Sequence, residues 1–380
     1  MLGLASTVSS SSTPESKYSL DFDGTDDHVS LGASNSIMTT SQSEASLSVW
    51  IKATGAESNG RYIFQNQKGE SSTNFGLRIN NDTGLAEALM WNGSSHSNPS
   101  STTDVTDGNW HHVVITGKAS EQKIYVDGSV EDTHAAAFSM IPSADDCTIG
   151  SLNGDNAFFN GKIDNVALWS VVLDADAVTA IYNSGKPTNL TFDDGDKYDN
   201  SSALVAYYRM GNGSFDDKAN GVVHDQHASG FGANVVVNGT FNSNTSSWAQ
   251  DSGADLTWQS DGTLLVETTA DATFAVKQTS ILTSGKVYKV TFRIKPDASG
   301  TIRTRLGGSG ASFSTTSFTA GQFNDIVVYG RAVGTFLEIG ATSGIDNFYL
   351  DDVVALPLNG LPALTSDADE SGFPFSSDTP

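Results

Sequence analysis

Two clusters of tryptophan and polar residues have the composition of a sugar-binding site. Trp91 is followed by Asn92 and His96 in a predicted loop, and Trp258 is followed by Gln259. The apolar face of a pyranose ring can stack on an aromatic side chain, while amide and imidazole groups beside it bond to the hydroxyl groups. These five residues are therefore the candidate carbohydrate-binding residues. The alternative for each tryptophan is packing in a hydrophobic core.

No pattern in the sequence predicts a catalytic residue. His111 and His112 follow Trp110, but neighbouring side chains on a strand point to opposite faces, so they cannot easily share one metal ion. We expect this pair to be structural. The sequence also lacks the Gly-x-Ser-x-Gly motif of serine hydrolases. We therefore expect a protein that is not an enzyme.

The elements that must position these residues are predicted to be strands. Short runs such as 45–52 alternate apolar and polar residues, and Asp127-Gly128 is a hairpin signal between two such runs. A single short helix is predicted over 175–183, with Asp174 as its N-cap and Gly185 after its end. This pattern predicts an all-β fold.

The formal net charge of −24 comes from aspartates scattered through predicted turns. Such a chain should have a strongly solvated surface with some cation ligands, and it should bind neither nucleic acid nor an anionic membrane. Cys147 is the one cysteine, which excludes an intramolecular disulfide. Packing, helped by metal ions, must hold the fold together.

No stretch has the length of a transmembrane helix, so membrane insertion is not expected. Residues 1–8 lack the basic start and apolar core of a secretory signal. We expect synthesis in a host cytoplasm without export. For an acidic all-β protein this favours a location in a virion, with an extracellular location as the alternative.

Four segments of the first half share a pattern of glycine, aspartate, tryptophan and alternating apolar residues. They are Tyr18–Gly32 with its Phe-Asp-Gly motif, Asn109–Gly117 with Trp-His-His, Lys123–Gly128, and Gly161–Gly185 with Ile-Asp-Asn-Val and Leu-Trp. Their order and motifs resemble the laminin-G-like jelly rolls, which are sandwiches of the concanavalin A-like lectin and glucanase type. The resemblance implies a fold and does not specify an activity.

A second set of segments begins at Asn234. It comprises Val235–Trp248 with Asn-Gly-x-Phe, Gly262–Glu267, Lys286–Ile294, and Asn347–Val354 with Asp-Asp-Val. These segments resemble the jelly-roll carbohydrate-binding modules found beside xylanases and cellulases. The fold class that we predict is therefore all-β, with two antiparallel β-sandwich (jelly-roll) domains.

These patterns divide the chain into five parts. The predicted parts are an N-terminal arm at 1–16, a laminin-G-like sandwich at 17–186, a connector at 187–233, a carbohydrate-binding-module-like sandwich at 234–357, and a flexible acidic tail at 358–380. Phe373 and Phe375 are possible docking residues within the tail.

The resemblance has consequences for chemistry. The hydrolytic members of the first family use two glutamates five residues apart on one strand, and no two glutamates here have that spacing, so glycoside hydrolysis is not expected. Both kinds of sandwich often hold a calcium ion where the first and last strands meet. By resemblance, the metal ligands are Asp23 and Asp164 in the first domain and Asn242 and Asp352 in the second. The alternative is that these are ordinary turn and edge residues.

The resemblance also implies that Trp50, Trp169 and Trp248 occupy core positions. Residues 203–225 resemble segments of structural proteins from marine bacteriophages. The predicted function is thus a bacteriophage virion structural protein, such as a head decoration, fibre or tail adhesin, that binds host-surface glycans without catalysis.

The predicted partners are cell-surface glycans and other virion subunits. A homo-oligomer is expected from the edge strands and the N-terminal arm, and a trimer by analogy with viral fibres. One alternative is a secreted or surface accessory carbohydrate-binding protein. The other is a purely structural virion spacer that binds no sugar.

Overall fold

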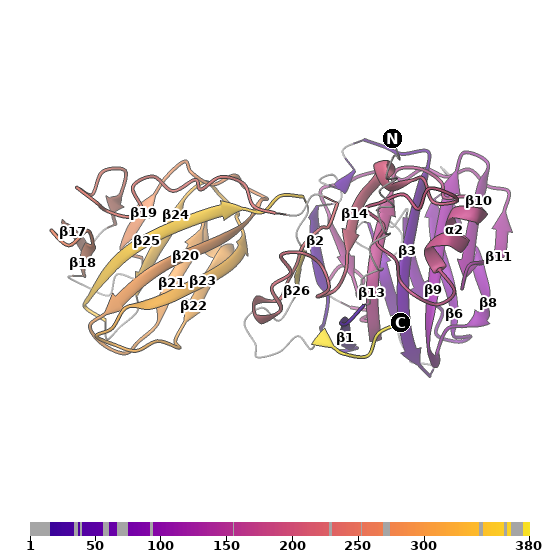
Figure 1. The fold of residues 1–380 in the computed structure, drawn as a ribbon, viewed down its shortest axis with the longest axis horizontal. Coiled ribbons are helices and arrows are strands. Elements are labelled where there is room, and N and C mark those ends of the chain that lie inside the picture. Colours follow the sequence, from indigo (N-terminus) through magenta and orange to yellow (C-terminus); the bar gives the residue numbers. More distant parts are fainter. Residues whose placement is uncertain are drawn as a thin grey trace, which may run out of the picture. The chain divides into compact units, whose positions relative to one another are not determined.

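The computed structural model describes residues 16–33, 37–38, 40–55, 61–66, 75–91, 94–154, 156–227, 230–251, 253–268, 274–341, 345–360, 363–365 and 375–380. These residues form antiparallel sheets, which confirms the predicted all-β fold (Figure 1). The chain divides into two domains. Gly230–Asn359 form the second domain, and the first contains the remaining residues on both sides of it. The described part of the chain has no helix long and apolar enough to span a membrane.

The first domain is a sandwich of two sheets, which we name after central strands. The β3 sheet contains, in spatial order, β11 (Ser129–His134), β10 (Glu121–Val126), β9 (Asp107–Lys118), β3 (Ala45–Thr54), β13 (Asn160–Trp169), β1 (Ser19–Asp23) and β27 (Phe375–Ser376), with β14 (Leu204–Tyr208) also paired to β13. Its central strands β3, β9 and β13 are buried on both faces, because successive side chains point alternately to the two faces of the sheet and both faces are covered.

The β4 sheet lies opposite the β3 sheet. It contains β15 (Val222–Val223), β26 (Ala363–Thr365), β2 (Val29–Ala33), β12 (Asp146–Ile149), β4 (Arg61–Gln65), β5 (Phe75–Ile79), β6 (Leu85–Trp91) and β7 (His96–Ser97), with β8 (Ser100–Asp104) also paired to β6. Apolar side chains of both sheets, such as Val49, Ile163 and Phe75, are fully buried in one cluster between them. This burial supplies most of the driving force for folding.

A second, smaller core covers the outer face of the β3 sheet. Trp169 and Val114 point away from the main core and pack against helix α2 (Ala175–Tyr182) and against Tyr198. The carboxylate of Asp174 accepts a hydrogen bond from the amide of Ala177 at 2.8 Å, which confirms the predicted N-cap. Short 3₁₀ turns follow in this domain, η1 (Ser201–Ala203) and η2 (Lys218–Asn220).

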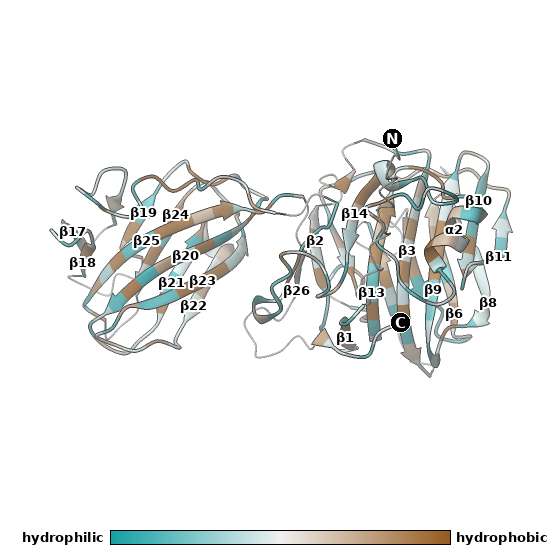
Figure 2. Ribbon diagram, viewed as in Figure 1, coloured by the Kyte–Doolittle hydropathy of each residue, from teal (hydrophilic) through white to brown (hydrophobic). Residues whose placement is uncertain are grey.

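The second domain is also a sandwich of two sheets. The β24 sheet contains β16 (Ala249–Gln250), β19 (Val276–Gln278), β24 (Leu337–Ala341), β21 (Ile302–Leu306) and β22 (Ser312–Thr315). The short 3₁₀ turn η3 (Ser309–Ala311) precedes β22. The β20 sheet contains β17 (Ala254–Trp258), β18 (Leu264–Thr268), β25 (Asn347–Pro357), β20 (Val287–Pro296) and β23 (Asn324–Arg331). Hydrophobic and hydrophilic residues alternate along these strands (Figure 2). Trp248 packs in the core between the sheets, as predicted.

The second domain is inserted into the first. The chain leaves the first domain after β15 and returns at β26, and these two strands pair with each other through Val222 and Leu364. The second domain covers Gly230–Asn359, four residues earlier and two residues later than the predicted 234–357. An insertion of this kind keeps its two ends close together, which suits a domain that folds on its own.

Two predicted boundaries were wrong. Residues 187–233 are not a separate connector, because β14 and β15 are strands of the first-domain sheets. Residues 358–380 are not a flexible tail either, because β26 and β27 also belong to those sheets. Phe375 packs against the core, as expected of a docking residue, whereas Phe373 and the arm residues 1–15 lie outside the described residues.

Candidate functional site

Trp91 and His96 are brought together at the end of the β6–β7 hairpin. They are directly paired, and their ring centroids lie 5.2 Å apart with the planes at 67°. The preceding Met90 is fully buried, so Trp91 points to the opposite, solvent-facing side of the β4 sheet. Both rings are half-buried. Asn92, the third predicted member of this cluster, lies outside the described residues.

A row of three polar side chains begins beside this pair and faces the other way. The hydroxyl of Ser97 lies 2.7 Å from Nδ1 of His134, and Nε2 of that histidine lies 3.1 Å from the carboxylate of Asp132. The same carboxylate accepts the amide hydrogen of Ser100 at 3.1 Å. The row therefore links β7 and β8 of one sheet to β11 of the other. Sequence analysis missed it because the register that joins strands so far apart cannot be derived from local patterns.

Trp258 is positioned by the loop beneath it. Its indole N–H donates to the carbonyl oxygen of Phe241 at 2.6 Å, and its partner across the ladder is Leu264, a core residue. The ring is nevertheless 38% exposed. Gln259 closes the adjacent turn, because its backbone N–H donates to the carbonyl oxygen of Thr263 at 2.9 Å. Trp258 thus fixes a loop at the rim of the second domain, and Gln259 lies next to it as predicted.

The outer face of the β20 sheet, which we call the β20 face, is polar and open. Along β20, Val290, Phe292 and Ile294 are buried in the core, so Lys289, Thr291, Arg293 and Lys295 point outward. The described apolar cluster of the second domain lies between its two sheets, and the rings of Phe231, Phe323 and Tyr329 contact the cationic side chains of the β20 face.

Two tyrosines flank the lysines of this face, of which Tyr349 is half-buried and Tyr329 is only 6% exposed. Tyr349 of β25 is paired with Lys295, whose Nζ lies 5.2 Å from the ring centroid, and Tyr329 of β23 is paired with Lys289 at 5.4 Å. The two lysines are six positions apart on β20, which separates the tyrosines by about 20 Å along the strand direction. Sequence analysis missed both tyrosines, although the alternation of buried Phe348 and outward Tyr349 was available as a signal.

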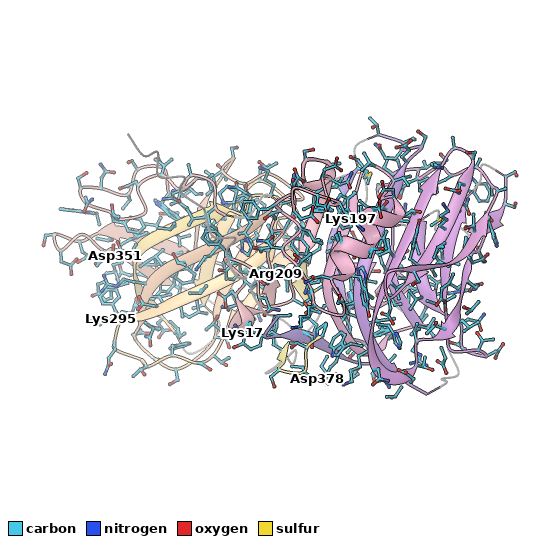
Figure 3. The ribbon with its side chains drawn as sticks, turned by 45° about the vertical axis from the view of Figure 1, so that its right-hand side comes forward. Lys17, Lys197, Arg209, Lys295, Asp351 and Asp378 are labelled. Atoms are coloured by element: carbon cyan, nitrogen blue, oxygen red, sulfur yellow. The ribbon has the colours of Figure 1, made fainter. Side chains whose placement is uncertain are left out.

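An arginine between two aspartates occupies the middle of the β20 face. Nη1 of Arg293 lies 3.3 Å from carboxylate oxygens of both Asp351 and Asp352, and its guanidinium stacks over Phe323 at 4.7 Å. Burial raises the pKa of the Asp351 carboxyl group, although a hydrogen bond from the backbone amide of Asp352 lowers it. Lys295 and Asp351, on neighbouring strands, are labelled in Figure 3. The face thus presents a row of cations on β20 with carboxylates and aromatic rings on the two neighbouring strands.

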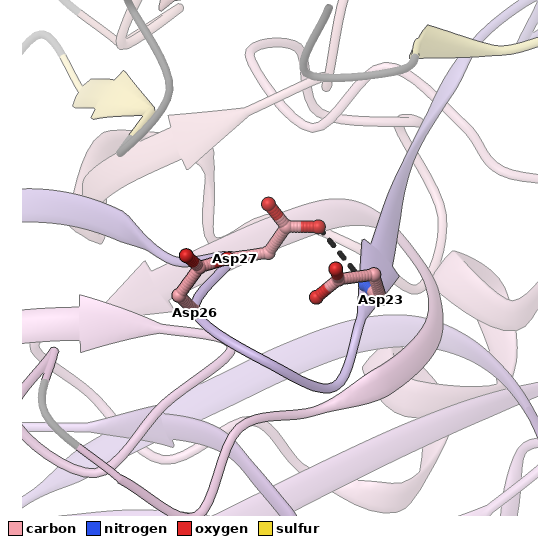
Figure 4. Close-up of side chains that lie close together, drawn as sticks. All are labelled: Asp23, Asp26 and Asp27. Atoms are coloured by element: carbon pink, nitrogen blue, oxygen red, sulfur yellow. Dashed lines mark hydrogen bonds between the residues drawn. The ribbon is translucent and has the colours of Figure 1, made fainter. Parts of the chain in front are cut away.

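Asp23 belongs to a cluster of three carboxylates in the β1–β2 turn. One oxygen each of Asp23, Asp26 and Asp27 lie within 4.8 Å of one another (Figure 4). Asp27 accepts the amide hydrogen of Asp23 at 2.9 Å, which shapes the turn. Oxygen donors at this spacing fit a calcium ion. The sequence signal for this set was present in Asp-Gly-Thr-Asp-Asp.

Asp164 is not brought to this cluster. Asp23 is paired with Asn160, and Asp164 lies four positions further along β13, about 13 Å away. Its carboxylate is fully buried and bonds to the hydroxyl of Ser16 and to the amide of Asn165. Burial raises its pKa to about 7, although these hydrogen bonds favour the charged form. Asp164 therefore anchors the start of β1, and the predicted pair Asp23–Asp164 does not form one site.

Asn242 and Asp352 have other partners in the second domain. Asn242 donates from Nδ2 to the hydroxyl of Thr240 at 2.9 Å, and the carboxylate of Asp352 pairs with Arg293. A guanidinium beside a carboxylate opposes the binding of a second cation there. This donor set does not fit the calcium site that the resemblance implied.

The two adjacent histidines of β9 point to opposite faces, as predicted. His111 lies between two carboxylates, 2.9 Å from Asp127 and 3.2 Å from Asp107, and the hydrogen bond with Asp127 raises its pKa despite burial. His112 is buried beneath α2, where Nε2 contacts the hydroxyl of Ser48 at 2.7 Å. Burial lowers the pKa of His112 to about 3. These contacts within the fold support the prediction that both residues are structural.

Comparison with protein families supports the assignment of the first domain. Residues 23–179 match the model of the concanavalin A-like lectin/glucanases superfamily. This range runs from the carboxylate turn through the β3 and β4 sheets to helix α2, so the first domain is a concanavalin A-like jelly roll. No curated protein sequence matches the chain.

Several solved structures are distantly similar. A heptameric SAP-like pentraxin from Limulus polyphemus is 17% identical, with a TM-score of 0.34, over 44% of this chain and 82% of the pentraxin. The CBM40 of the Ruminococcus gnavus IT-sialidase, bound to α2,3-sialyllactose, is 16% identical, with a TM-score of 0.36, over 44% of this chain and 99% of the module.

A xylanase is similar over a smaller share of its length. The Clostridium thermocellum endo-1,4-β-D-xylanase 10B, with its CBM22-1 and GH10 modules and complexed with xylohexaose, is 21% identical, with a TM-score of 0.27, over 33% of this chain. The match spans 28% of that xylanase chain. These similarities are too distant to transfer an activity.

Proposed function

We propose that this protein binds glycans without chemically altering them, and that the β20 face is its principal binding surface. The observation that carries the proposal is the set of outward side chains on one sheet, where the half-buried Tyr349 lies beside Lys295 and near Arg293 and Asp351. The match of residues 23–179 to a superfamily that includes lectins supports a glycan as the ligand class.

The chemistry of the β20 face suits an extended oligosaccharide. The ring of Tyr349 provides an apolar surface on which a sugar ring can stack, and the lysine ammonium groups and the carboxylates of Asp351 and Asp325 can donate to or accept from the hydroxyl groups. The cations that now lie over the rings sit on long side chains, which can move aside and bond to the sugar. Such a surface binds weakly per site, so many copies are needed for firm attachment.

The Trp91–His96 pair is a smaller second surface. It combines one half-buried indole with one imidazole at a hairpin end, so it can contact a single sugar ring. Trp258 is less suited, because its N–H is already bonded to Phe241. We expect the contribution to glycan binding to decrease from Tyr349 to Trp91 to Trp258.

The finer part of the proposal is that the protein is exposed on a bacteriophage particle, where it binds host-surface glycans next to other virion subunits and as a homo-oligomer. It is supported by the resemblance of residues 203–225 to structural proteins of marine bacteriophages. An accessory carbohydrate-binding protein of a bacterial surface is the alternative. Immunogold labelling of intact particles distinguishes the two, because labelling of purified virions excludes the alternative.

We also propose that calcium binds to Asp23, Asp26 and Asp27 and tightens the turn at the start of the first domain. The support is the convergence of three carboxylates, of which Asp27 is buried. The ion would hold the β1–β2 turn, and the proposal assigns it no contact with the glycan.

A second candidate function, ester hydrolysis, is favoured by one observation. Ser97, His134 and Asp132 are linked in the order of a hydrolytic triad, with Nδ1 of the histidine facing the serine and Nε2 facing the aspartate, the reverse of the serine-protease arrangement. If the row is catalytic, Ser97→Ala will abolish hydrolysis of a p-nitrophenyl ester and His134→Gln will reduce it. The glycan-binding proposal predicts that both variants equal the wild-type protein in this assay, because the row then only links two strands.

The test of the main proposal is a glycan array with the purified full chain, run with calcium and again with a chelator. The ligand that binds best is then titrated into Tyr349→Ala and into Phe192→Ala. Phe192 is 71% exposed but lies in the first domain, so it is a matched control for an exposed aromatic ring. Loss of binding in the first variant alone supports the proposal. Absence of binding to every glycan by the folded protein favours the purely structural spacer.

A further inference from the structure

A short strand, β27, is added to the edge of the β3 sheet among the described residues. Leu20 of β1 is paired with Phe375 and Ser19 with Ser376, and β27 is the last strand on that side among the described residues. In Figure 1 this strand lies next to β1. Because no described strand pairs beyond it, β27 can leave without separating any other pair of strands.

Phe375 fits a shaped position beside β1. Its ring packs against the main core of the first domain. Gly211 lies directly below it, and a Cβ atom at that position would be 2.6 Å from Cδ1 of the ring. The backbone of Gly211 has φ of +96°, which also requires glycine. The first domain therefore has room for the aromatic ring of Phe375 because residue 211 has no side chain.

Asp378 is held by three groups of the first domain. Its carboxylate lies 2.8 Å from Nζ of Lys52 and accepts the indole hydrogen of Trp110 at 3.1 Å, while its carbonyl oxygen accepts the hydroxyl of Ser19 at 2.7 Å. Burial raises the pKa of Asp378, but the bonds from Lys52 and Trp110 outweigh it and hold that pKa below its ordinary value. Figure 3 labels this aspartate near the end of the chain.

From these contacts we infer that residues 375–380 are an exchangeable strand, which one copy of this chain donates to the same position on a second copy. The receiving position consists of Ser19, Leu20, Lys52, Trp110 and Gly211, and every copy carries both this position and the strand that fills it. Exchange preserves all of these contacts, so it costs little besides the entropy of association.

Two features of the chain favour exchange. The strand is held by two ladder positions and a few side chains, so few contacts oppose its dissociation. An emptied position would expose Leu20, a core residue, and an unpaired strand edge, so it must be filled again. Nine residues, 366–374, separate β26 from β27, and a chain of that length can span about 30 Å. At high local concentration a neighbouring copy competes with the chain's own strand.

The test uses cysteines at the directly paired positions Ser19 and Ser376. Ser19→Cys and Ser376→Cys chains are prepared separately, one with a mass tag, mixed at increasing concentration under reducing conditions and then oxidised. Cys147 is fully buried, and burial raises the pKa of its thiol, so it does not compete. Exchange predicts a disulfide-linked heterodimer on a non-reducing gel, in an amount that rises with protein concentration.

Two controls make the outcome decisive. The double variant Ser19→Cys/Ser376→Cys must close a disulfide within one chain at low concentration, which verifies the pairing. A mixture of Ser129→Cys and Ser376→Cys measures chance collisions, because Ser129 is exposed on β11 at the opposite edge of the sheet. We expect about tenfold more heterodimer from the paired cysteines than from this control. Equal yields, a lack of heterodimer, or an open double variant would each overturn the inference.

Discussion

The two sandwiches differ in how the outer faces of the β3 and β20 sheets are covered. The β3 sheet of the first domain is covered on its outside by helix α2 and by residues around Tyr198. The β20 sheet of the second domain presents its outer side chains without an apolar cover among the described residues. From this difference we propose that a ligand binds at edges and hairpin ends in the first domain and on the sheet itself in the second.

The side chains at outward positions explain this difference. On the β3 sheet these positions carry Val114, Tyr125 and Trp169, which must be removed from water. On β20 they carry lysines, a threonine and an arginine, which are stable in water. The cover in the first domain is thus a requirement of its own strands, whereas the outward groups of β20 are polar and pair with neighbouring carboxylates and aromatic rings.

Among the variants that test this contrast, Trp169→Ala should have the largest effect. Removing this fully buried indole should cost the first domain about 3–5 kcal/mol of unfolding free energy, because the cover of the β3 sheet collapses around a cavity. Tyr349→Ala on the open face should change the unfolding free energy of the second domain by about 0.5 kcal/mol or less. Denaturant titration followed by circular dichroism checks both. Similar costs at the two positions would contradict the distinction between a covered and an open face.

The covered face should also make the first domain sensitive to acid. His112 has a pKa of about 3 when folded, against 6.5 for the ordinary side chain. Between these values the unfolded state binds a proton that the folded state excludes, so the unfolding free energy falls as pH falls. The expected contribution is about 1.4 kcal/mol per pH unit. The difference between wild-type and His112→Gln proteins, measured from pH 7 to pH 4, should have this slope; a flat difference would show that the imidazole is not buried as described.

The cap of helix α2 should have a smaller effect. Asp174→Ala removes the acceptor for the amide of Ala177 and should lower the unfolding free energy of the first domain by about 1 kcal/mol. Asp174→Asn preserves an acceptor and serves as the control. Thermal unfolding of both variants checks the expectation, which fails if the two are equally destabilised.

Calcium should give the smallest effect, confined to the first domain. At a free calcium concentration equal to its Kd, binding at Asp23, Asp26 and Asp27 should add about 0.4 kcal/mol. Differential scanning calorimetry with calcium and with a chelator measures it, and Asp26→Asn should remove the difference. A calcium shift of the second-domain transition would contradict the conclusion that Arg293 blocks a site at Asp352.

Local features of the fold could be predicted from the sequence. The helix was predicted at 175–183 and is observed at Ala175–Tyr182, because its N-cap and its hydrophobic spacing act over a few residues. The buried positions of Trp50, Trp169 and Trp248 were implied by the family resemblance, which itself is carried by short motifs. These predictions succeeded because each depends on residues that are close together in the sequence.

Features that depend on distant strand pairing could not be predicted. The return of the chain to the first domain after residue 359 depends on the pairing of β26 with β15 and of β27 with β1. The separation of Asp164 from Asp23 likewise follows from the register of β1 with β13. The tyrosines of the β20 face come from two strands on either side of β20. No local pattern specifies which strands become neighbours.

The central claim is that glycan binding occurs on the open sheet of the second domain. Isothermal titration calorimetry with the best array ligand tests it most directly when wild-type, Tyr349→Ala, Trp91→Ala and Trp258→Ala proteins are compared. We predict that Tyr349→Ala weakens binding by about tenfold or more, in keeping with about 1–2 kcal/mol for a stacked aromatic ring, and that the two tryptophan variants bind more like the wild type. Full binding by Tyr349→Ala together with loss of binding by Trp91→Ala would contradict the claim and move the site to the β6–β7 hairpin.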